Sequence, residues 1–138
     1  MDISIHNLDK KLSIMHDEIV DLIRQTVYKL DLDARSIQII FVDDETLRTM
    51  HEDYLNDPDY TDVMTFNLGD DQIEGEIYIS VDRVKENAKI FEVSVEKEIC
   101  RNIIHGILHL KGYTDKEDTE KTIMKQKEEE LLNQMQNL

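Results

Sequence analysis

Two histidines and an aspartate constrain this chain more than any other feature. His105 and His109 interrupt an apolar run at 103–110, and Gly112 and Asp115 follow. Residues i and i+4 lie on one face of a helix, so both imidazoles can point to the same place. Glycine accepts the left-handed backbone that ends many helices, so the chain can reverse there and bring the aspartate back toward the histidines. The pattern predicts a helix with three potential metal ligands at its end.

Two imidazoles and one carboxylate form a suitable ligand set for a divalent ion, above all zinc. Three protein ligands leave a tetrahedral ion one position for water, as in catalytic sites. The alternative is that both histidines make ordinary hydrogen bonds, and a bare pair would favour it. The aspartate after the turn glycine favours the metal. We therefore expect His105, His109 and Asp115 to hold one Zn²⁺ or another divalent ion.

The spacing HxxxHxxGxxD is also that of metzincin peptidases, with aspartate as the third ligand. Those enzymes carry a general-base glutamate directly after the first histidine. Here that position is Gly106, which has no proton acceptor. The sequence therefore favours a hydrolase that acts on a bond other than the peptide bond.

The rest of the chain predicts an α+β scaffold. Runs of β-branched residues indicate strands at 3–5, 36–42, 61–66 and 73–80. Apolar residues three and four apart indicate helices over 14–30, 44–54, 82–91 and 94–110, and a last helix from about 117. We expect a small mixed β-sheet packed with helices, with the metal site on a central helix and the turn after it. No linker or repeat divides residues 1–138, so we expect a single domain.

The net charge of the chain limits the classes of partner that it can bind. The chain has 16 Lys and Arg against 31 Asp and Glu, a net charge of −15, which argues against general nucleic-acid binding. The distribution is uneven, because residues 49–82 hold no Lys or Arg, whereas 83–127 hold ten. A local basic face in the second half therefore remains possible.

The sequence predicts a cytoplasmic location. No apolar run reaches the length needed to span a bilayer, and the first ten residues lack a signal-peptide pattern. The single cysteine, Cys100, suits a reducing compartment and is expected to pack in the core.

Three segments of the chain match the motifs of one protein family. They are HGILHLKGYTD at 105–115, TDVMTF at 61–66 and GEIYIS at 75–80. They resemble the HGxLHLxGYDH signature, the TDVLSF segment and the GDIxIS strand of the YbeY family of bacterial metal proteins. Met124 falls where the family has a methionine in its final helix. The resemblance covers nearly the whole chain.

This resemblance implies a single-strand-specific, zinc-dependent endoribonuclease of ribosomal RNA maturation and ribosome quality control. Its implied partners are ribosomal RNA, the small ribosomal subunit and associated proteins, with neither DNA nor a membrane. Two positions depart from the family pattern: Asp115 stands where a third histidine is usual, and Leu55 where an arginine is common. Two alternatives stay open, a non-catalytic ribosome-assembly factor with a structural metal and a metal hydrolase of another substrate.

Several side chains are candidates for supporting the site. Arg101, one turn before His105, is the nearest helical cation for a developing phosphate charge. Glu98 and Asn102 share a similar face and could orient the ligands. For these three the simpler expectation is a solvated surface. Asp62 and Thr65 are expected to line a cleft, and the alternative for Asp62 is a hydrogen-bonding role in a turn.

Other residues are expected to be uninvolved. The acidic run Glu128 to Glu130 is expected to form a solvated helix face. His6, His16 and His51 have no partner at ligand spacing and are expected to be ordinary surface or core residues.

Overall fold

A computed structural model describes residues 1–135, so the last three residues of the expected 1–138 domain lie outside the described part. Its sheet has four strands in the order β1-β2-β4-β3. Strand β1 (Asp2–His6) pairs in parallel with β2 (Ala34–Val42), and β2 pairs in parallel with β4 (Ile73–Ser80). Strand β3 (Val63–Asn67) is antiparallel to β4. The mixed sheet confirms the predicted α+β class.

Alternation along the central strands determines which face of the sheet is buried. Ile37, Ile39 and Phe41 of β2 are buried, and the residues between them are partly exposed. In the register of the two strands, Ile39 lies opposite Ile77 of β4, which is also buried. Successive strand residues point to opposite sides, so one side of both strands faces the core.

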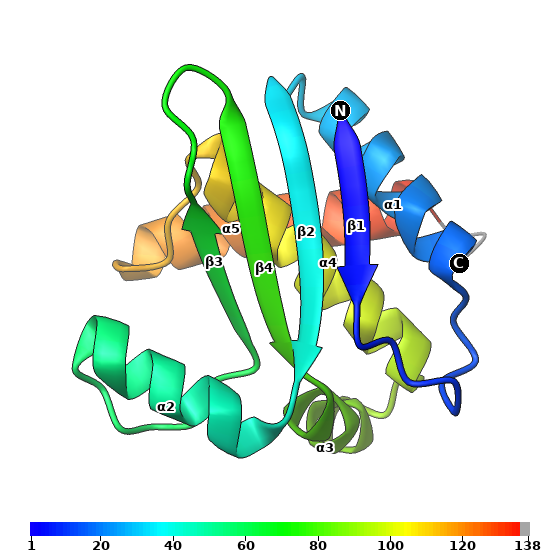
Figure 1. Cartoon of the computed structure of the whole chain (residues 1–138), viewed down its shortest axis with the longest axis vertical. Helices are drawn as coiled ribbons and strands as arrows, with labels where there is room; N and C mark the ends of the chain where they lie inside the picture. The colour runs from blue at the N-terminus through cyan, green and yellow to red at the C-terminus, as the bar shows by residue number, and fades with distance from the viewer. Residues whose placement is uncertain (136–138) are drawn as a thin grey trace.

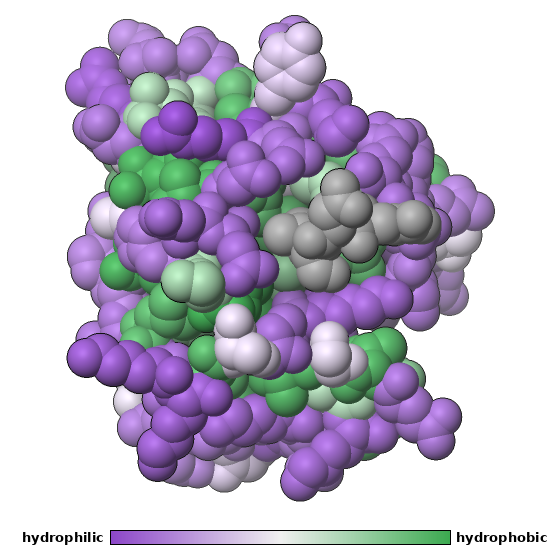
Figure 2. Space-filling view, turned by 90° about the vertical axis from the view of Figure 1, so that its right-hand side faces the viewer, coloured by the Kyte–Doolittle hydropathy of each residue, from purple (hydrophilic) through white to green (hydrophobic). Residues whose placement is uncertain are grey.

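Three helices cover the buried face of this sheet. Figure 1 shows α1 (His16–Lys29), α4 (Val95–Lys111) and α5 (Asp118–Gln134) on the same side, with α4 crossing behind the strands. Helices α2 (Asp44–Leu55) and α3 (Val81–Phe91) lie together near one end of the sheet. The surface on the α1 side is mostly hydrophilic, with apolar side chains visible between polar ones (Figure 2), as expected where amphipathic helices cover a core.

Helix α4 is the central helix predicted from the sequence. Ser94 caps its N-terminus by accepting a hydrogen bond from the backbone N–H of Lys97. Its apolar stripe, Ile99, Ile103 and Ile107, is fully buried. The predicted core residue Cys100 is buried beside this stripe, and burial raises the pKa of its thiol to about 12. Helix α4 is therefore fixed in the core, and this packing also holds the histidines near its end in place.

Two local details differ from what the helical pattern of the sequence predicts. Phe91 shares the helical spacing of Val84 and Ala88, which are buried, but 61 % of its surface is exposed. It is the last residue of α3, where this face opens onto the cleft described below. Helix α1 begins at His16 and not at residue 14, because Met15 has extended backbone and occupies the N-cap position.

Candidate metal centre

The end of α4 carries the two predicted histidines. The Nε2 atoms of His105 and His109 lie 3.1 Å apart, as the spacing of four residues predicts. The helix ends at Gly112, whose φ of 116° is in the left-handed region. The backbone N–H groups of Gly112 and Tyr113 both donate to the carbonyl of Leu108. This cap turns the chain sharply and sends the next residues back along the helix.

The turn brings Asp115 to both imidazoles. Its Oδ2 atom lies 3.7 Å from His105 Nε2 and 3.6 Å from His109 Nε2. One ligand atom from each residue can be chosen so that all three lie within 4.8 Å of one another. The cluster predicted from the sequence is therefore assembled in the structure, and it could hold a metal ion.

The remaining ring nitrogens are held by other groups. His105 Nδ1 lies 2.9 Å from Glu128 Oε1, and His109 Nδ1 lies 3.1 Å from the carbonyl oxygen of Tyr113. Both partners only accept hydrogen bonds, so both Nδ1 atoms must donate. In the neutral rings the Nε2 atoms are then unprotonated acceptors. Metal-binding histidines typically have this arrangement, with one nitrogen on the metal and the other N–H on an acceptor.

The donor set fits a divalent cation. Two unprotonated imidazole nitrogens and a carboxylate oxygen converge with their lone pairs toward one point, an arrangement that is repulsive without a positive charge between them. For His105, burial by itself lowers the pKa, but the hydrogen bond to Glu128 and nearby carboxylates outweigh it, so the pKa is raised. For His109, burial and the neighbouring His105 lower the pKa. Nitrogen and oxygen donors of this kind suit zinc.

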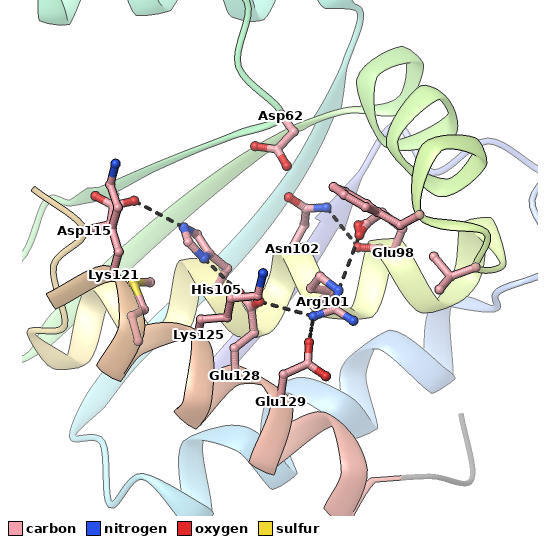
Figure 3. A pocket seen from close by; sticks show the side chains of 13 residues that line it. Asp62, Glu98, Arg101, Asn102, His105, Asp115, Lys121, Lys125, Glu128 and Glu129 are labelled. Carbon is pink, nitrogen blue, oxygen red and sulfur yellow. Dashed lines mark hydrogen bonds and ion pairs between the residues drawn. The ribbon is translucent and has the colours of Figure 1, made fainter. Parts of the chain in front are cut away.

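The cluster opens into a cleft of about 460 Å³, formed by the end of α3, α4, α5 and the segment before β3. Figure 3 shows Asp62, His105 and Asp115 around the same space, with α5 forming one wall. Asp62 lies in this cleft, as expected, whereas Thr65 is not among its lining residues. Thr65 lies opposite the inward-facing Ile77, and its position on the core side of β3 explains the wrong prediction.

Arg101 was expected to be a solvated surface residue, and the structure shows that this expectation is wrong. Its side chain is 22 % exposed and pairs with three carboxylates. Glu98 Oε1 lies 3.4 Å from Nε, Glu128 Oε2 lies 3.3 Å from Nη1, and Glu129 also contacts Nη1. Arg101 lines the cleft, but its charge is compensated by these acids.

Glu98 and Asn102 are buried, so the solvated face expected for them is also wrong. Asn102 donates a hydrogen bond to the backbone carbonyl of Glu98 over 2.9 Å. Glu98 Oε1 makes no hydrogen bond within residues 1–135, and its ion pair with Arg101 is long. Burial raises the pKa of Glu98, although Arg101 opposes the shift.

Asp62 is positioned by the strand and by α3. Its backbone carbonyl accepts the N–H of Ser80 over 2.9 Å, and its Oδ2 accepts a hydrogen bond from Asn87 over 3.4 Å. Burial raises the pKa of its carboxyl group, and the backbone N–H of Asp62 itself and the nearby His105 oppose this only in part. The cleft therefore contains a carboxyl group whose pKa is shifted toward the range used in proton transfer.

Sequence reasoning missed Glu128. The run Glu128 to Glu130 was expected to be solvated, but Glu128 is only 7 % exposed and binds His105. The available signal was helical spacing: Met124, Glu128, Leu131 and Leu132 share one face, and all are buried. A carboxylate within such a stripe needs a partner in the core.

The other histidines and Leu55 lie elsewhere. His6 contacts Ser4 and Gln38, and His51 contacts the Asp59 carbonyl, so they take no part in the described site. His16 lies beside Asp17 at the start of α1. Leu55, at the end of α2, is 62 % exposed and does not line the cleft.

Packing explains why Gly106 cannot be the glutamate of a peptidase. A β carbon added there would lie 2.9 Å from side-chain atoms of Ile77 in the core. Position 106 thus faces the sheet and not the ligands. The structure gives a general base no room at this position.

Fold and site together define a small α+β protein with two helical histidines and an aspartate at the end of a cleft, a ligand set typical of metal-dependent hydrolases. The family model described as endoribonuclease YbeY matches residues 4–136. The endoribonuclease YbeY of Flavobacterium psychrophilum is 48 % identical over 98 residues, 70 % of this chain and 69 % of that one. That of Flavobacterium johnsoniae is 36 % identical over 126 residues, 90 % and 91 % of the two chains.

A solved structure has a similar fold. The solution structure of a protein from Thermotoga maritima matches with a TM-score of 0.67 and 30 % identity, over 94 % of this chain and 86 % of that one. The chain therefore belongs to the endoribonuclease YbeY family. Membership identifies it as a hydrolytic nuclease of the endoribonuclease class.

None of the helices within residues 1–135 combines the length and the apolarity that crossing a membrane would require.

Proposed function

We propose that this protein is a zinc-dependent, single-strand-specific endoribonuclease that acts in the cytoplasm in ribosomal RNA maturation and ribosome quality control. The observation that carries the proposal is the convergence of His105, His109 and Asp115 at the end of a cleft, with His105 oriented by the buried Glu128. The expected partners are ribosomal RNA, the small ribosomal subunit and its associated proteins.

Each residue of the site has a distinct role in this proposal. His105, His109 and Asp115 would hold the ion, which when bound supplies a Lewis acid for the phosphodiester group and an activated water. Glu128 and the Tyr113 carbonyl fix both rings so that the Nε2 atoms face the ion.

Asp62 can accept or release a proton at its carboxyl group, because burial has already raised its pKa. A single-stranded substrate is supported by the size of the cleft, because about 460 Å³ is in the range of pockets that hold a small ligand such as one unpaired nucleotide.

The test compares the native chain with two histidine variants. His109→Ala removes a candidate ligand, and His51→Ala, whose ring hydrogen-bonds the backbone carbonyl of Asp59 away from the cleft, is the matched control. Bound metal is measured in each purified preparation, and cleavage is followed on single-stranded ribosomal RNA and on the same sequence in a duplex. We expect about one ion per chain and cleavage of the single strand by the native and His51→Ala proteins alone. If His109→Ala cleaves equally well, the activity comes from a contaminating nuclease and the proposal fails.

A second candidate function is a non-catalytic ribosome-assembly factor with a structural metal. The compensated charge of Arg101 and the exposed Leu55 favour it, because neither supplies a free cation for phosphate. This function predicts that the native chain and Asp62→Asn bind the small subunit equally in low-salt pull-downs without cleaving RNA. Loss of that binding would count against it.

A further inference from the structure

Two lysines line the cleft on the side of α5. Lys121, Met124, Lys125 and Glu128 all contribute to its lining. They are spaced by three and four residues, so they form a single face of α5. Figure 3 shows both lysine side chains extending from α5 along the cleft, that of Lys121 beside Asp115 and that of Lys125 beside His105 in this view.

Within residues 1–135, neither ammonium group has a carboxylate at ion-pair distance. Lys125 would ordinarily pair with the acids three and four positions later on its own helix. Those acids are Glu128 and Glu129, and both instead contact residues of α4. The lysine charges therefore remain available to a ligand in the cleft.

The balance of charge around the cleft makes these lysines important to an anion. Its lining has five carboxylates, Asp62, Glu98, Asp115, Glu128 and Glu129, against three cations, Arg101, Lys121 and Lys125. A divalent ion would bring this set close to neutrality. Without the two lysines an approaching phosphate would still meet an excess of negative charge.

A different element contributes an aromatic surface to the same cleft. Phe91, at the end of α3, lines it and is 61 % exposed, so its ring is accessible to a ligand in the cleft. Unpaired bases stack on exposed aromatic rings in proteins that bind single strands, while cations contact the backbone. The volume of about 460 Å³ is in the range of pockets that bind small ligands.

We propose that Lys121, Lys125 and Phe91 form a nucleotide-binding subsite for single-stranded RNA, in which the lysines contact backbone phosphates and the ring stacks on a base. The inference rests on the proposed function, because it specifies how the substrate of that site is held. It also names the cations of this chain that act on phosphate although Leu55 stands where the family commonly has an arginine.

The experiment measures binding separately from cleavage. The probe is a labelled, 2′-O-methylated single-stranded RNA, added to the zinc-loaded protein and shown on a gel to remain intact. The variant Lys121→Gln/Lys125→Gln is compared with Lys10→Gln/Lys11→Gln, which removes the same charge from exposed positions outside the cleft. Phe91→Ala is compared with Tyr28→Ala, since Tyr28 is 86 % exposed on α1. Zinc content and thermal unfolding are recorded for each variant.

The expected results are quantitative. Two lost phosphate contacts should reduce the slope of log affinity against log salt concentration by about 1.4 and weaken binding roughly 10- to 30-fold near 0.1 M salt. Phe91→Ala should weaken binding at least about 5-fold with little change in that slope. The Lys10/Lys11 and Tyr28 variants should bind like the native chain.

The outcomes separate the two proposals. If the cleft lysine variant binds the probe as its control does while the native chain cleaves RNA, the subsite is overturned and the endoribonuclease proposal stands. If the native chain binds RNA through the lysines but does not cleave it, the subsite stands and the proposed catalytic function fails.

Discussion

Replacing Glu128 by Gln tests the physical account of the metal centre most directly. This substitution keeps the shape of the side chain but removes the charge that His105 and Arg101 contact at 2.9 and 3.3 Å. Glu128 is 7 % exposed, so solvent screens these contacts little. Loss of a group that orients a metal-binding histidine typically costs 10- to 100-fold in metal affinity, or about 1.4–2.7 kcal/mol.

The chain offers a matched control two residues away. Glu130 is in the same acidic run, but its side chain is 53 % exposed, and within residues 1–135 it pairs with Lys127 across one helical turn and with Gln134. Glu130→Gln should leave metal binding unchanged. Glu128→Ala removes the acceptor altogether and should weaken binding more than Glu128→Gln.

Affinity is measured by competition of the protein with a chromophoric zinc chelator. Unfolding of the metal-free variants is measured separately, so that a loss of fold is not taken for a loss of ligand orientation. Arg101 keeps Glu98 and Glu129 in these variants, which limits the effect on folding. A Glu128→Gln protein that binds zinc within about twofold of the Glu130→Gln protein would refute the role assigned to Glu128.

Three further predictions concern packing, pH and metal. Gly106→Ala should destabilise the protein by about 1 kcal/mol in denaturant unfolding. Crowding against Ile77 costs ~1–3 kcal/mol, and the better helix propensity of alanine offsets ~1 kcal/mol of this. A variant more stable than the native chain would contradict the packing described. Metal-free Asp62→Asn should be more stable than the native chain at neutral pH. The pKa of Asp62 is higher in the folded than in the unfolded state, so the native chain loses stability as the pH rises from the unfolded-state pKa through the folded-state pKa. The extra stability of Asp62→Asn should therefore vanish near pH 4, about the pKa of an unperturbed aspartate. A stability difference that does not depend on pH would be contrary evidence. A zinc chelator should lower the unfolding temperature of the native chain and leave that of His109→Ala unchanged. For the native chain the loss corresponds to about 2.7 kcal/mol of unfolding free energy at a hundredfold excess of zinc over its dissociation constant. Equal shifts in both proteins would argue against this ligand set.

Local geometry made part of the site predictable. His105 and His109 are separated by about one helical turn, and Gly112 reverses the chain, so the approach of Asp115 follows from residues close in sequence. The strands were predictable for a similar reason, since alternation in β2 and β4 reports directly which face is buried.

Contacts between distant elements were not predictable in this way. Glu128 is 23 residues from His105, and a charged run gives no sign of which acid turns inward. Phe91 has the spacing of a buried residue, but the end of a helix need not be covered. Arg101 could be placed on α4 from the sequence, whereas its three acidic partners depend on how α5 docks.

The order of the site's parts along the chain has a consequence for its assembly. The three candidate ligands fall within eleven consecutive residues of α4 and the turn after it, while the carboxylate that orients His105 comes from α5. Synthesis of the chain therefore completes the candidate ligand segment before the helix that orients the first imidazole. Until α5 docks, His105 lacks the acceptor that fixes its ring, so an incompletely synthesised chain would carry the candidate ligands without their final orientation.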